Sequence, residues 1–367
     1  MKKQEISVAE LQQLLNEGTQ VQILDIRPQQ QRDEWMIAGS IHKDVYEEII
    51  AGNQNALDDV TLSADVPVVT VCGGGRSSLI AADILNQKGY HAYSLQGGMK
   101  AWNYAWSTAE IKTLDVTIIQ VKRVAKGCLS YIIGSGEQAI VIDAALDPAT
   151  YTQLAENYGW KIVYIMDTHL HADYISRSLD LAGELGAELL FNKSAETDFP
   201  FTGIHDGQII PFGQSIFEVI FTPGHTAEST SFLVNNQFLF TGDTLFTNGV
   251  GRPDLKANES KALLKAEQLY NSIQHIKSFP GETFILPAHT SQSLGFDNTV
   301  ITSRLFQIVA QVDLLSLSKE DFVKQTLERI SPTPPNYEQI ALINKTGNHE
   351  GITPSDLEAG ANRCAVS

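Results

Sequence analysis

Four short motifs between residues 168 and 290 contain side chains that bind metal ions. The first motif, residues 168–173, places His169, His171 and Asp173 at positions i, i+2 and i+4, which turns all three to one side of an extended backbone. Three later motifs each add one candidate, and these are His225, Asp243 and His289. A lone histidine is usually structural, but four histidines and two aspartates in short loops predict a metal site.

Cys72 is a second candidate for chemistry, as a sulfur nucleophile. It directly follows the apolar run Val68–Val71, and the loop after it consists of Gly73, Gly74, Gly75, Arg76 and Ser77. A thiol at the start of a helix, surrounded by backbone N–H groups of a glycine-rich turn and beside Arg76, is stabilised as a thiolate, which can take up sulfur. The alternative is an inert cysteine buried after a core strand.

The first hundred residues contain the alternating elements of a small parallel α/β domain. A capping box predicts a helix at Ser7–Leu15, and apolar runs predict strands at Val21–Leu24 and Val68–Val71. A further helix is expected over 77–88, ended by a glycine. Such alternation indicates a parallel sheet covered by helices, so Cys72 is expected at a strand-to-helix turn.

The rest of the chain is predicted to form a second domain rich in strands. A polar connector is expected at 107–114, between a first domain at 1–106 and a second at 115–317, and residues 318–367 are expected to be a tail that is helical and then extended through its prolines. Strands are predicted at Val116–Val121, Leu129–Ile133, Ala139–Ile142, Ile162–Met166, Ile216–Phe221, Phe238–Phe240 and Phe284–Leu286. Each metal-binding motif follows one of these strands, so the polar side chains should meet at one edge of a sheet sandwich.

Composition disfavours several classes of function. A chain of 367 residues with 43% hydrophobic residues can bury two cores of ordinary size. Its 26 basic and 43 acidic residues give a net charge of −17, which disfavours nucleic acid as a partner. No apolar run has the length of a signal peptide or a membrane span, so we expect a cytoplasmic protein without a membrane partner. Three cysteines are too few for a disulfide framework; Cys128 is expected to be structural, and Cys364 in the tail is given no role.

The N-terminal motifs together resemble a single rhodanese domain over about residues 1–106. The resemblance rests on the order and spacing of four segments, which are Leu24–Arg27, Ile37–His42, Val71–Ser77 and Leu95–Trp102. It implies that Cys72 is the catalytic residue and carries a persulfide. The family loop usually ends in arginine, whereas here Arg76 is fifth and Ser77 is last. This departure implies weaker thiosulfate binding or another sulfur donor, and some rhodanese-like domains only bind.

The four metal motifs, in their order, resemble the metallo-β-lactamase fold over about residues 115–315. The resemblance implies an αββα sandwich in which Asp143 supports the site. Two-metal hydrolases of this fold, such as glyoxalase II, place a histidine directly after the aspartate of the first motif. Here that position is Tyr174, whose phenol of pKa near 10 is a poor ligand for a divalent ion. A zinc-dependent thioester hydrolase, in which a metal-bound hydroxide attacks the carbonyl, is therefore the weaker alternative.

The persulfide dioxygenases of this fold are the preferred resemblance, and they bind one Fe(II) per chain. The resemblance implies that His169, His225 and Asp243 bind the ion and leave positions free for oxygen and a substrate sulfur. Tyr174 departs from this family too, because its members usually keep histidine there. Three further residues would orient ligands or water, or act as alternative metal ligands, and these are His171, Asp173 and His289.

Arg252 lies in a segment, residues 242–254, that also resembles the dioxygenases. By this resemblance it binds a carboxylate of the thiol that carries the persulfide, in the forked geometry that a guanidinium offers. A structural ion pair with Asp254 is the alternative, and the two can hold together.

The expected activity is oxidation of a low-molecular-weight thiol persulfide by oxygen to sulfite and thiol. Cys72 would couple this oxidation to sulfane-sulfur transfer, with a donor or acceptor such as sulfite or thiosulfate. A sulfur sensor or carrier that binds persulfide without turnover is a third interpretation, from another class of protein. The sequence leaves open which thiol is used, the direction of sulfur transfer and whether the chain forms a homo-oligomer.

Overall fold

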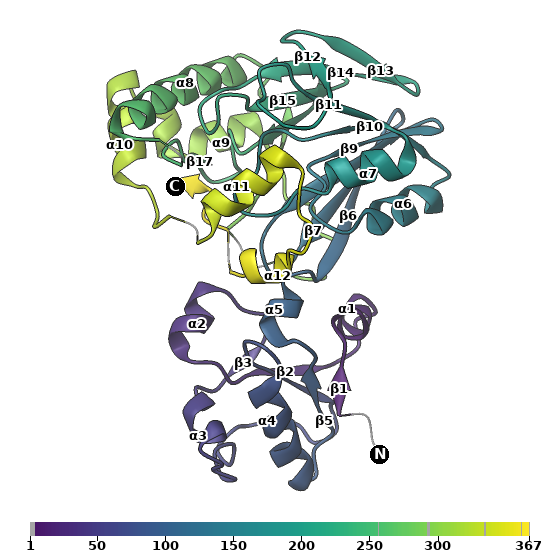
Figure 1. Ribbon diagram of the computed structural model, residues 1–367, viewed down its shortest axis with the longest axis vertical. Coiled ribbons are helices and arrows are strands. Elements are labelled where there is room, and N and C mark those ends of the chain that lie inside the picture. Colours follow the sequence, from purple (N-terminus) through teal and green to yellow (C-terminus); the bar gives the residue numbers. More distant parts are fainter. Residues whose placement is uncertain (1–3, 256, 292–293, 334, 361, 367) are drawn as a thin grey trace.

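The computed structural model describes residues 4–255, 257–291, 294–333, 335–360 and 362–366, and they form two domains that lie one above the other (Figure 1). The N-terminal domain has one sheet, in which all neighbouring strands are parallel and follow the order β1-β5-β4-β2-β3. Its strands are β1 (Glu5–Ile6), β2 (Gln22–Asp25), β3 (Ile41–His42), β4 (Val68–Val71) and β5 (Ala92–Leu95). Its helices are α1 (Val8–Asn16), α2 (Gln29–Glu34), α3 (Tyr46–Ile50), α4 (Arg76–Gln87) and α5 (Gly98–Trp102). The predicted parallel α/β domain is confirmed, and Ser7 forms the capping box of α1.

Two glycines allow the cysteine loop to lie against the start of α5. Gly97 and Gly98 have positive φ angles of 72° and 56°. A Cβ on Gly98 would lie 2.3 Å from the carbonyl oxygen of Cys72 and 2.8 Å from the backbone nitrogen of Gly75. The Met99 N–H donates to the same Cys72 carbonyl at 2.8 Å. Because no side chain fits at this contact, the glycine at position 98 fixes how closely the loop and the helix pack.

The second domain contains two sheets that pack face to face. Their strand orders are β12-β11-β10-β9-β8-β7-β6 and β13-β14-β15-β16-β18-β19. The first sheet consists of β6 (Trp106–Lys112), β7 (Thr117–Arg123), β8 (Leu129–Ser135), β9 (Gln138–Ile142), β10 (Lys161–Met166), β11 (Glu188–Asn192) and β12 (Thr202–Ile204). The second consists of β13 (Ile209–Phe212), β14 (Ser215–Phe221), β15 (Thr230–Val234), β16 (Phe238–Gly242), β18 (Phe284–Pro287) and β19 (Ser303–Arg304).

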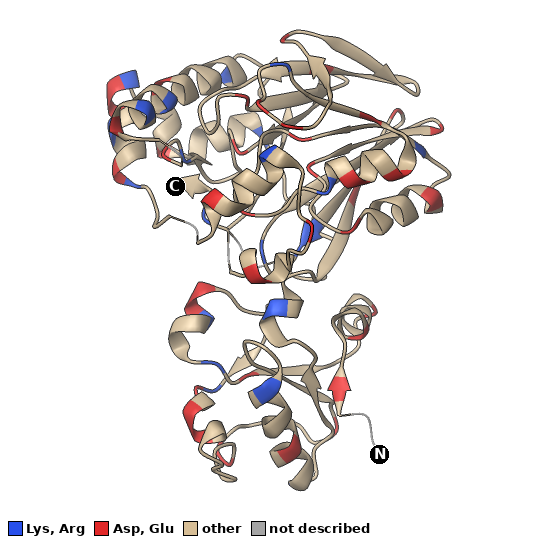
Figure 2. Ribbon diagram, in the orientation of Figure 1, with Lys and Arg blue, Asp and Glu red and all other residues tan. Residues whose placement is uncertain are grey.

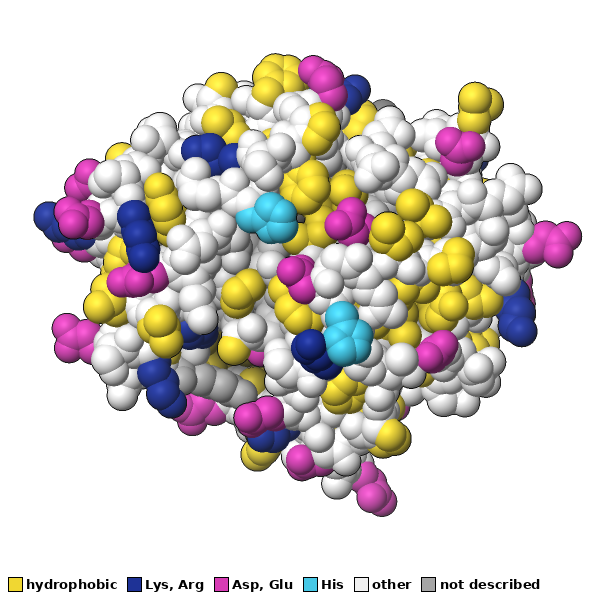
Figure 3. Space-filling view, turned by 90° about the horizontal axis from the view of Figure 1, so that it is seen from above, with side chains coloured by type: hydrophobic (Ala, Val, Ile, Leu, Met, Phe, Trp, Pro, Cys, Tyr) yellow, Lys and Arg dark blue, Asp and Glu magenta, His cyan; other side chains and the backbone are white. Residues whose placement is uncertain are grey.

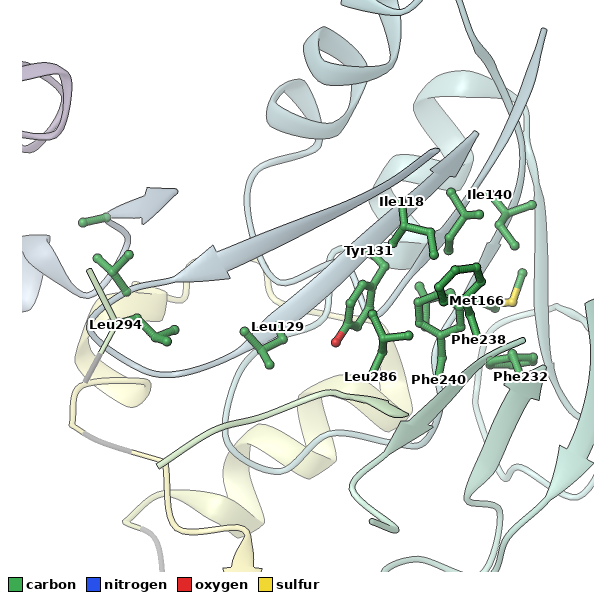
Figure 4. Packing of buried hydrophobic residues seen from close by; sticks show 14 of the residues in the cluster. Ile118, Leu129, Tyr131, Ile140, Met166, Phe232, Phe238, Phe240, Leu286 and Leu294 are labelled. Carbon is green, nitrogen blue, oxygen red and sulfur yellow. The ribbon is translucent and has the colours of Figure 1, made fainter. Parts of the chain in front are cut away.

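Alternating side chains on these strands face different layers. In β7, Ile118 packs in the core between the sheets, while Ile119 packs under α6 (Pro148–Asn157) and α7 (Ser178–Leu185). In β16, Phe240 faces the same inner core and Leu239 packs against the opposite helices, which are α8 (Glu259–Lys277), α9 (Leu305–Gln311) and α10 (Lys319–Glu328). Tyr131 lies in the inner core edge-on to Phe240, with ring centroids 4.8 Å apart (Figure 4). The predicted αββα sandwich is confirmed.

The expected connector at 107–114 is instead mostly a strand. Strand β6 pairs antiparallel with β7 in continuous register from Trp106–Arg123 to Lys112–Thr117. It lies at the edge of its sheet, where Glu110 and Lys112 are exposed and Ala109 is buried. Edge strands carry charged side chains on their open face, so their composition is close to that of a polar linker.

The C-terminal tail crosses back over the second domain. After α10, which follows the short 3₁₀ helix η1 (Asp313–Ser316), come α11 (Tyr337–Thr346), α12 (Pro354–Leu357) and β20 (Ala365–Val366), which pairs with β17 (Val250–Gly251). Of the proline-rich segment expected to be extended, residues 331–333 form no helix or strand, and Pro334 lies outside the described residues. Helix α12 lies between the two domains, where Asp356 pairs with Lys100 of α5 at 3.1 Å (Figure 1). The tail thus contacts both domains.

Charged side chains are dispersed over the described surface. Figure 2 shows Lys and Arg on separate elements of both domains, interspersed with Asp and Glu. The end of the second domain that is turned away from the first shows hydrophobic, acidic and basic side chains intermixed (Figure 3). Within the described ranges, no helix is long and apolar enough to cross a membrane.

We predict that Gly98→Ala destabilises the N-terminal domain more than Gly89→Ala does. Both glycines have positive φ, but a Cβ on Gly89 would meet nothing within 4 Å. The control should therefore lose only the roughly 1 to 2 kcal/mol of a left-handed residue. Gly98→Ala adds overpacking of about 1 to 3 kcal/mol. Denaturant midpoints measure the difference, and equal midpoints would contradict the close contact with the cysteine loop.

Candidate metal centre and sulfur loop

Asp143 connects the ends of two neighbouring strands at the edge where the predicted metal ligands lie. Strands β9 and β10 are parallel and pair Ile142 with Met166, so the residues that follow them leave the sheet side by side. The Asp143 carboxylate accepts the Thr168 N–H at 2.7 Å and the Thr168 hydroxyl at 2.9 Å. Its Oδ1 also lies 3.1 Å from Nε2 of His171. These contacts agree with the supporting role expected of Asp143.

His169, His225 and Asp243 meet beyond this edge. Each follows a different strand, β10, β14 and β16, and none is more than 3% exposed. Nε2 of His169 and Nε2 of His225 lie 3.9 and 3.6 Å from Oδ2 of Asp243. Ligand atoms bound at about 2.1 Å to one ion are roughly 3 to 4 Å apart, so these three atoms fit a common metal ion.

Hydrogen bonds on the far side of each imidazole set its orientation. Nδ1 of His225 lies 2.8 Å from the carbonyl oxygen of Arg252, and Nδ1 of His169 lies 2.9 Å from the Thr168 hydroxyl. Both Nε2 atoms are therefore turned toward Asp243. Burial is the main reason that the pKa of each histidine is lowered, so both imidazoles stay neutral, which is the form that binds metal.

Oδ2 of Asp243 is buried and, among the described residues, has no hydrogen-bond partner. Burial opposes ionisation of this carboxyl, but the charge and hydrogen bond of His289 outweigh burial, so the pKa of Asp243 is lowered. A buried carboxylate oxygen without a donor is unfavourable. An ion held by the two neighbouring imidazoles would satisfy this oxygen, and the residues therefore fit a metal ion.

His289 bridges two carboxylates on the other side of Asp243. Its Nδ1 lies 2.5 Å from Oδ1 of Asp243, and its Nε2 lies 3.0 Å from Oδ2 of Asp173. Burial disfavours a charged imidazole, but the two carboxylates raise the pKa of His289 well above its ordinary value. The sulfur of Cys128 lies 3.7 Å from the same oxygen of Asp173. Cys128, Asp173 and His289 thus form a second buried group of potential ligands.

Tyr174 contacts His171 and not the triad. Its hydroxyl lies 2.8 Å from Nε2 of His171, and the two rings stack with centroids 4.3 Å apart. Burial raises the pKa of Tyr174 well above its ordinary value, so the phenol stays protonated. A protonated phenol does not replace the histidine that binds the second ion in hydrolases of this fold.

Arg252 is buried and directs its guanidinium to the chain itself. Nε and Nη2 each donate to one carboxylate oxygen of Asp254 at 2.8 Å. Further N–H bonds go to backbone carbonyls of the tail, which belong to Ser331, Pro332 and Arg363. The structural pair with Asp254 is therefore present, and a substrate carboxylate could reach this guanidinium only if the tail moved.

Cys72 lies at the expected strand-to-helix turn, directly after β4, and is 2% exposed. Its sulfur accepts the Gly75 N–H at 3.1 Å and lies 3.2 Å from the Ser78 hydroxyl. Burial raises the pKa of this thiol, but hydrogen bonds from Ser77, Ser78 and the backbone outweigh burial, so the pKa is lowered. Arg76, expected to favour the thiolate, is exposed. The contribution of the serine hydroxyls was missed from the sequence.

The C-terminal tail reaches the metal centre, which no sequence motif indicated. Cys364 is buried, and its sulfur lies within 4.8 Å of ligand atoms of Asp243 and His289. The side-chain amide of Asn362 donates to Asp173 at 2.9 Å. These contacts join residues far apart in the chain and have no local pattern that could have predicted them.

Comparison with known families agrees with this architecture. Residues 7–105 match the rhodanese-like domain, and residues 123–289 match the metallo-beta-lactamase superfamily. The solved structure of a metallo-beta-lactamase from Staphylococcus aureus subsp. aureus COL is similar, with a TM-score of 0.59, 28% identity and coverage of 64% of this chain and 74% of that chain.

Two kinds of curated relative match a part of this chain. "Persulfide dioxygenase ETHE1, mitochondrial" of Bos taurus is 34% identical over 226 residues, which cover 59% of this chain and 83% of the relative. "Hydroxyacylglutathione hydrolase" of Rhizobium johnstonii is 30% identical over 201 residues, which cover 53% of this chain and 75% of the relative. With its motifs, fold and relatives in agreement, the chain belongs to the metallo-beta-lactamase superfamily, in the group of persulfide dioxygenases and hydroxyacylglutathione hydrolases, and it carries a rhodanese-like domain ahead of that fold.

Proposed function

We propose that the second domain is a persulfide dioxygenase that holds one Fe(II) at His169, His225 and Asp243. The reaction converts a low-molecular-weight persulfide, oxygen and water into the thiol, sulfite and two protons. Iron at such a triad supplies the redox chemistry that activates oxygen. The observation that carries the proposal is the partnerless Oδ2 of Asp243, which faces two neutral imidazoles in a buried site.

The residues around the triad hold its three ligands in place. Asp143 fixes Thr168, whose hydroxyl in turn contacts Nδ1 of His169. The Arg252 carbonyl orients His225, and His289 occupies Oδ1 of Asp243 so that only Oδ2 faces the imidazoles. Such supporting contacts set ligand orientation and tune metal affinity.

A zinc-dependent thioester hydrolase is the rival, and it is supported by the hydroxyacylglutathione hydrolases among the relatives. That reaction uses two metal ions in enzymes of this fold. Tyr174 counts against it, because the buried phenol contacts His171 in place of a second ion.

We further propose that Cys72 transfers sulfane sulfur as a protein persulfide. The lowered pKa of its thiol and the N–H of Gly75 directed at its sulfur support a thiolate that attacks a sulfur donor. Sulfite or thiosulfate would act as the acceptor or donor. Because the two sites lie on one chain, the product of each site is present at a raised effective concentration at the other site.

The metal site predicts about one iron per chain after anaerobic purification, together with persulfide-dependent oxygen uptake. Asp243→Asn should bind iron more than about tenfold less tightly, because an anionic ligand is lost. Asp147→Asn is the control, since Asp147 only caps α6 and asparagine caps equally well. Metal analysis and an oxygen electrode give the result. Two tightly bound zinc ions with thioesterase activity would overturn the proposal in favour of the hydrolase.

Cys72→Ser should abolish sulfur transfer and leave oxygen uptake within about twofold of the unmodified protein. The reason is that the cysteine loop and the metal triad lie in separate domains with separate sheets. A thiosulfate sulfurtransferase assay and oxygen uptake are measured on the same preparation. Loss of oxygen uptake with iron retained would show instead that Cys72 feeds the metal site directly.

From the hydrogen bonds of the serine hydroxyls we predict how the reactivity of the Cys72 thiol depends on pH. Because hydrogen bonds to the thiolate lower its pKa, the rate of alkylation should reach half its maximum at a lower pH than for an ordinary cysteine. Ser78→Ala removes one of these bonds and should shift the midpoint to higher pH. Ser63→Ala, an exposed serine of the same domain, should leave it unchanged. The rate of iodoacetamide labelling of Cys72 measures this, and an unmoved midpoint in Ser78→Ala would contradict the assignment.

A further inference from the structure

The end of the tail places a third sulfur atom beside the metal triad. Cys364 is 2% exposed, and its sulfur lies within 4.8 Å of ligand atoms of both Asp243 and His289. The backbone there is held by the pairing of β20 with β17, and the Arg252 N–H donates to the Cys364 carbonyl at 2.9 Å. The same residue, Arg252, accepts the bond from His225 through its own carbonyl. One segment therefore orients a metal ligand and the tail thiol.

Two polar residues of the tail fix where the thiol lies. Asn362 donates to Asp173 at 2.9 Å and accepts the Cys364 N–H at 2.8 Å, so the turn before the cysteine is tied to the metal centre. Glu358 is 1% exposed and forms a buried ion pair with Arg123 at 2.8 Å. Buried polar contacts of this kind are satisfied only in one arrangement. They give the tail a defined position in place of a loose association.

The tail also occupies the guanidinium that the family resemblance assigns to the thiol substrate. Nη1 and Nη2 of Arg252 donate to the carbonyls of Ser331, Pro332 and Arg363. Arg363 directly precedes Cys364, so this chain presents its own carbonyl and its own thiol where a small thiol would present a carboxylate and a sulfur.

The triad side of this arrangement has an unmet requirement for a ligand. Oδ2 of Asp243 is buried and without a hydrogen-bond partner among the described residues, whereas Nε2 of His289 lies 3.0 Å from Oδ2 of Asp173. The sulfur of Cys364 lies next to these two residues and not at a remote surface. The sulfur of Cys364 and the carboxyl group of Asp243, one oxygen of which has no partner, thus lie beside each other.

We propose that Cys364 is the sulfur-carrying thiol of the metal centre, which receives sulfane sulfur and presents it for oxidation as a protein persulfide. This inference rests on the proposed dioxygenase function and names its immediate substrate. The low-molecular-weight persulfide is then the donor of sulfur, and the molecule that is oxidised is the persulfide of Cys364.

The chemistry balances in two steps. In the first, the sulfur of the Cys364 thiol attacks the outer sulfur of the donor persulfide and its proton passes to the leaving sulfur; a new S–S bond forms, the donor S–S bond breaks, and the donor leaves as its thiol, with no net oxidation. In the second, the Cys364 persulfide, oxygen and water give the Cys364 thiol, sulfite and two protons. The S–S bond breaks, and four electrons pass from sulfur to oxygen. Loading requires the tail end to lift, and a ladder of only two residues such as β20 is readily opened.

The first test traps the intermediate. Iron-loaded Cys72→Ser protein is incubated with glutathione persulfide without oxygen, blocked with an alkylating agent and digested for peptide mass spectrometry. We expect one additional sulfur atom on Cys364. On admission of oxygen, the additional sulfur should disappear and sulfite should form in equal amount. The proposal would be overturned if Cys364 carried no additional sulfur while an untreated portion of the same incubation consumed oxygen.

The second test uses Cys364→Ser, which keeps the size of the side chain and removes the sulfur. We expect oxygen uptake at saturating glutathione persulfide to fall at least tenfold, while iron content and thermal unfolding stay unchanged. Glu350→Gln, an exposed tail residue, is the control and should keep full activity. Full-rate uptake by Cys364→Ser would overturn the tail proposal and leave the dioxygenase standing. No uptake by the iron-loaded unmodified protein would overturn the dioxygenase itself.

Discussion

The buried carboxylate of Asp243 is the group on which the metal centre depends. It takes part in two interactions of different kinds: Oδ1 lies 2.5 Å from His289, and Oδ2 faces the imidazoles of His169 and His225. An isolated buried carboxylate is strongly disfavoured; one oxygen is stabilised by His289, and the proposed metal ion would stabilise the other. His289 can stabilise it because Asp173 holds its opposite nitrogen at 3.0 Å. The contacts from Asp173 to His289 and from His289 to Asp243 therefore occupy Oδ1 of Asp243 and leave only its Oδ2 free to bind a metal ion.

The two chemical sites use the same structural principle with different groups. In both domains a reactive residue directly follows a buried parallel strand, because side chains at strand ends are exposed to a common edge. At Cys72 the charge is stabilised by hydroxyl and N–H groups, and close packing there requires a glycine at position 98. At the triad the charge of the Asp243 carboxylate is balanced by His289 and, when bound, by a cation. Among the described residues, each site is built from residues of its own domain and the tail. Helix α12 connects the two domains through the ion pair of Asp356 with Lys100.

Local patterns were sufficient to predict most of the fold, and the family resemblance singled out the three residues that we propose as metal ligands. Apolar runs predicted the bounds of strands such as β4 and β10 to within about one residue, because a buried strand requires a continuous apolar sequence. Strand β6 was mistaken for a connector, because an edge strand with Glu110 and Lys112 facing solvent lacks that sequence. Ser78 was missed as a partner of Cys72 because a serine in a helix carries no signal of what it contacts.

The tail could not have been predicted for a deeper reason, which Arg252 illustrates. From sequence, its guanidinium had two candidate partners, a substrate carboxylate and Asp254, and the structure gives it the second together with carbonyls of the tail. The ion pair alone would leave N–H groups buried without acceptors, an unfavourable state. The tail carbonyls satisfy them, so burying Arg252 and docking the tail depend on each other. Cys364 is carried to the metal centre by this dependence and not by a motif of its own. A substrate that needs Arg252 must break its contacts with Ser331, Pro332 and Arg363, whereas opening the end of the tail around Cys364 breaks, among the bonds of Arg252, only those to the carbonyls of Arg363 and Cys364.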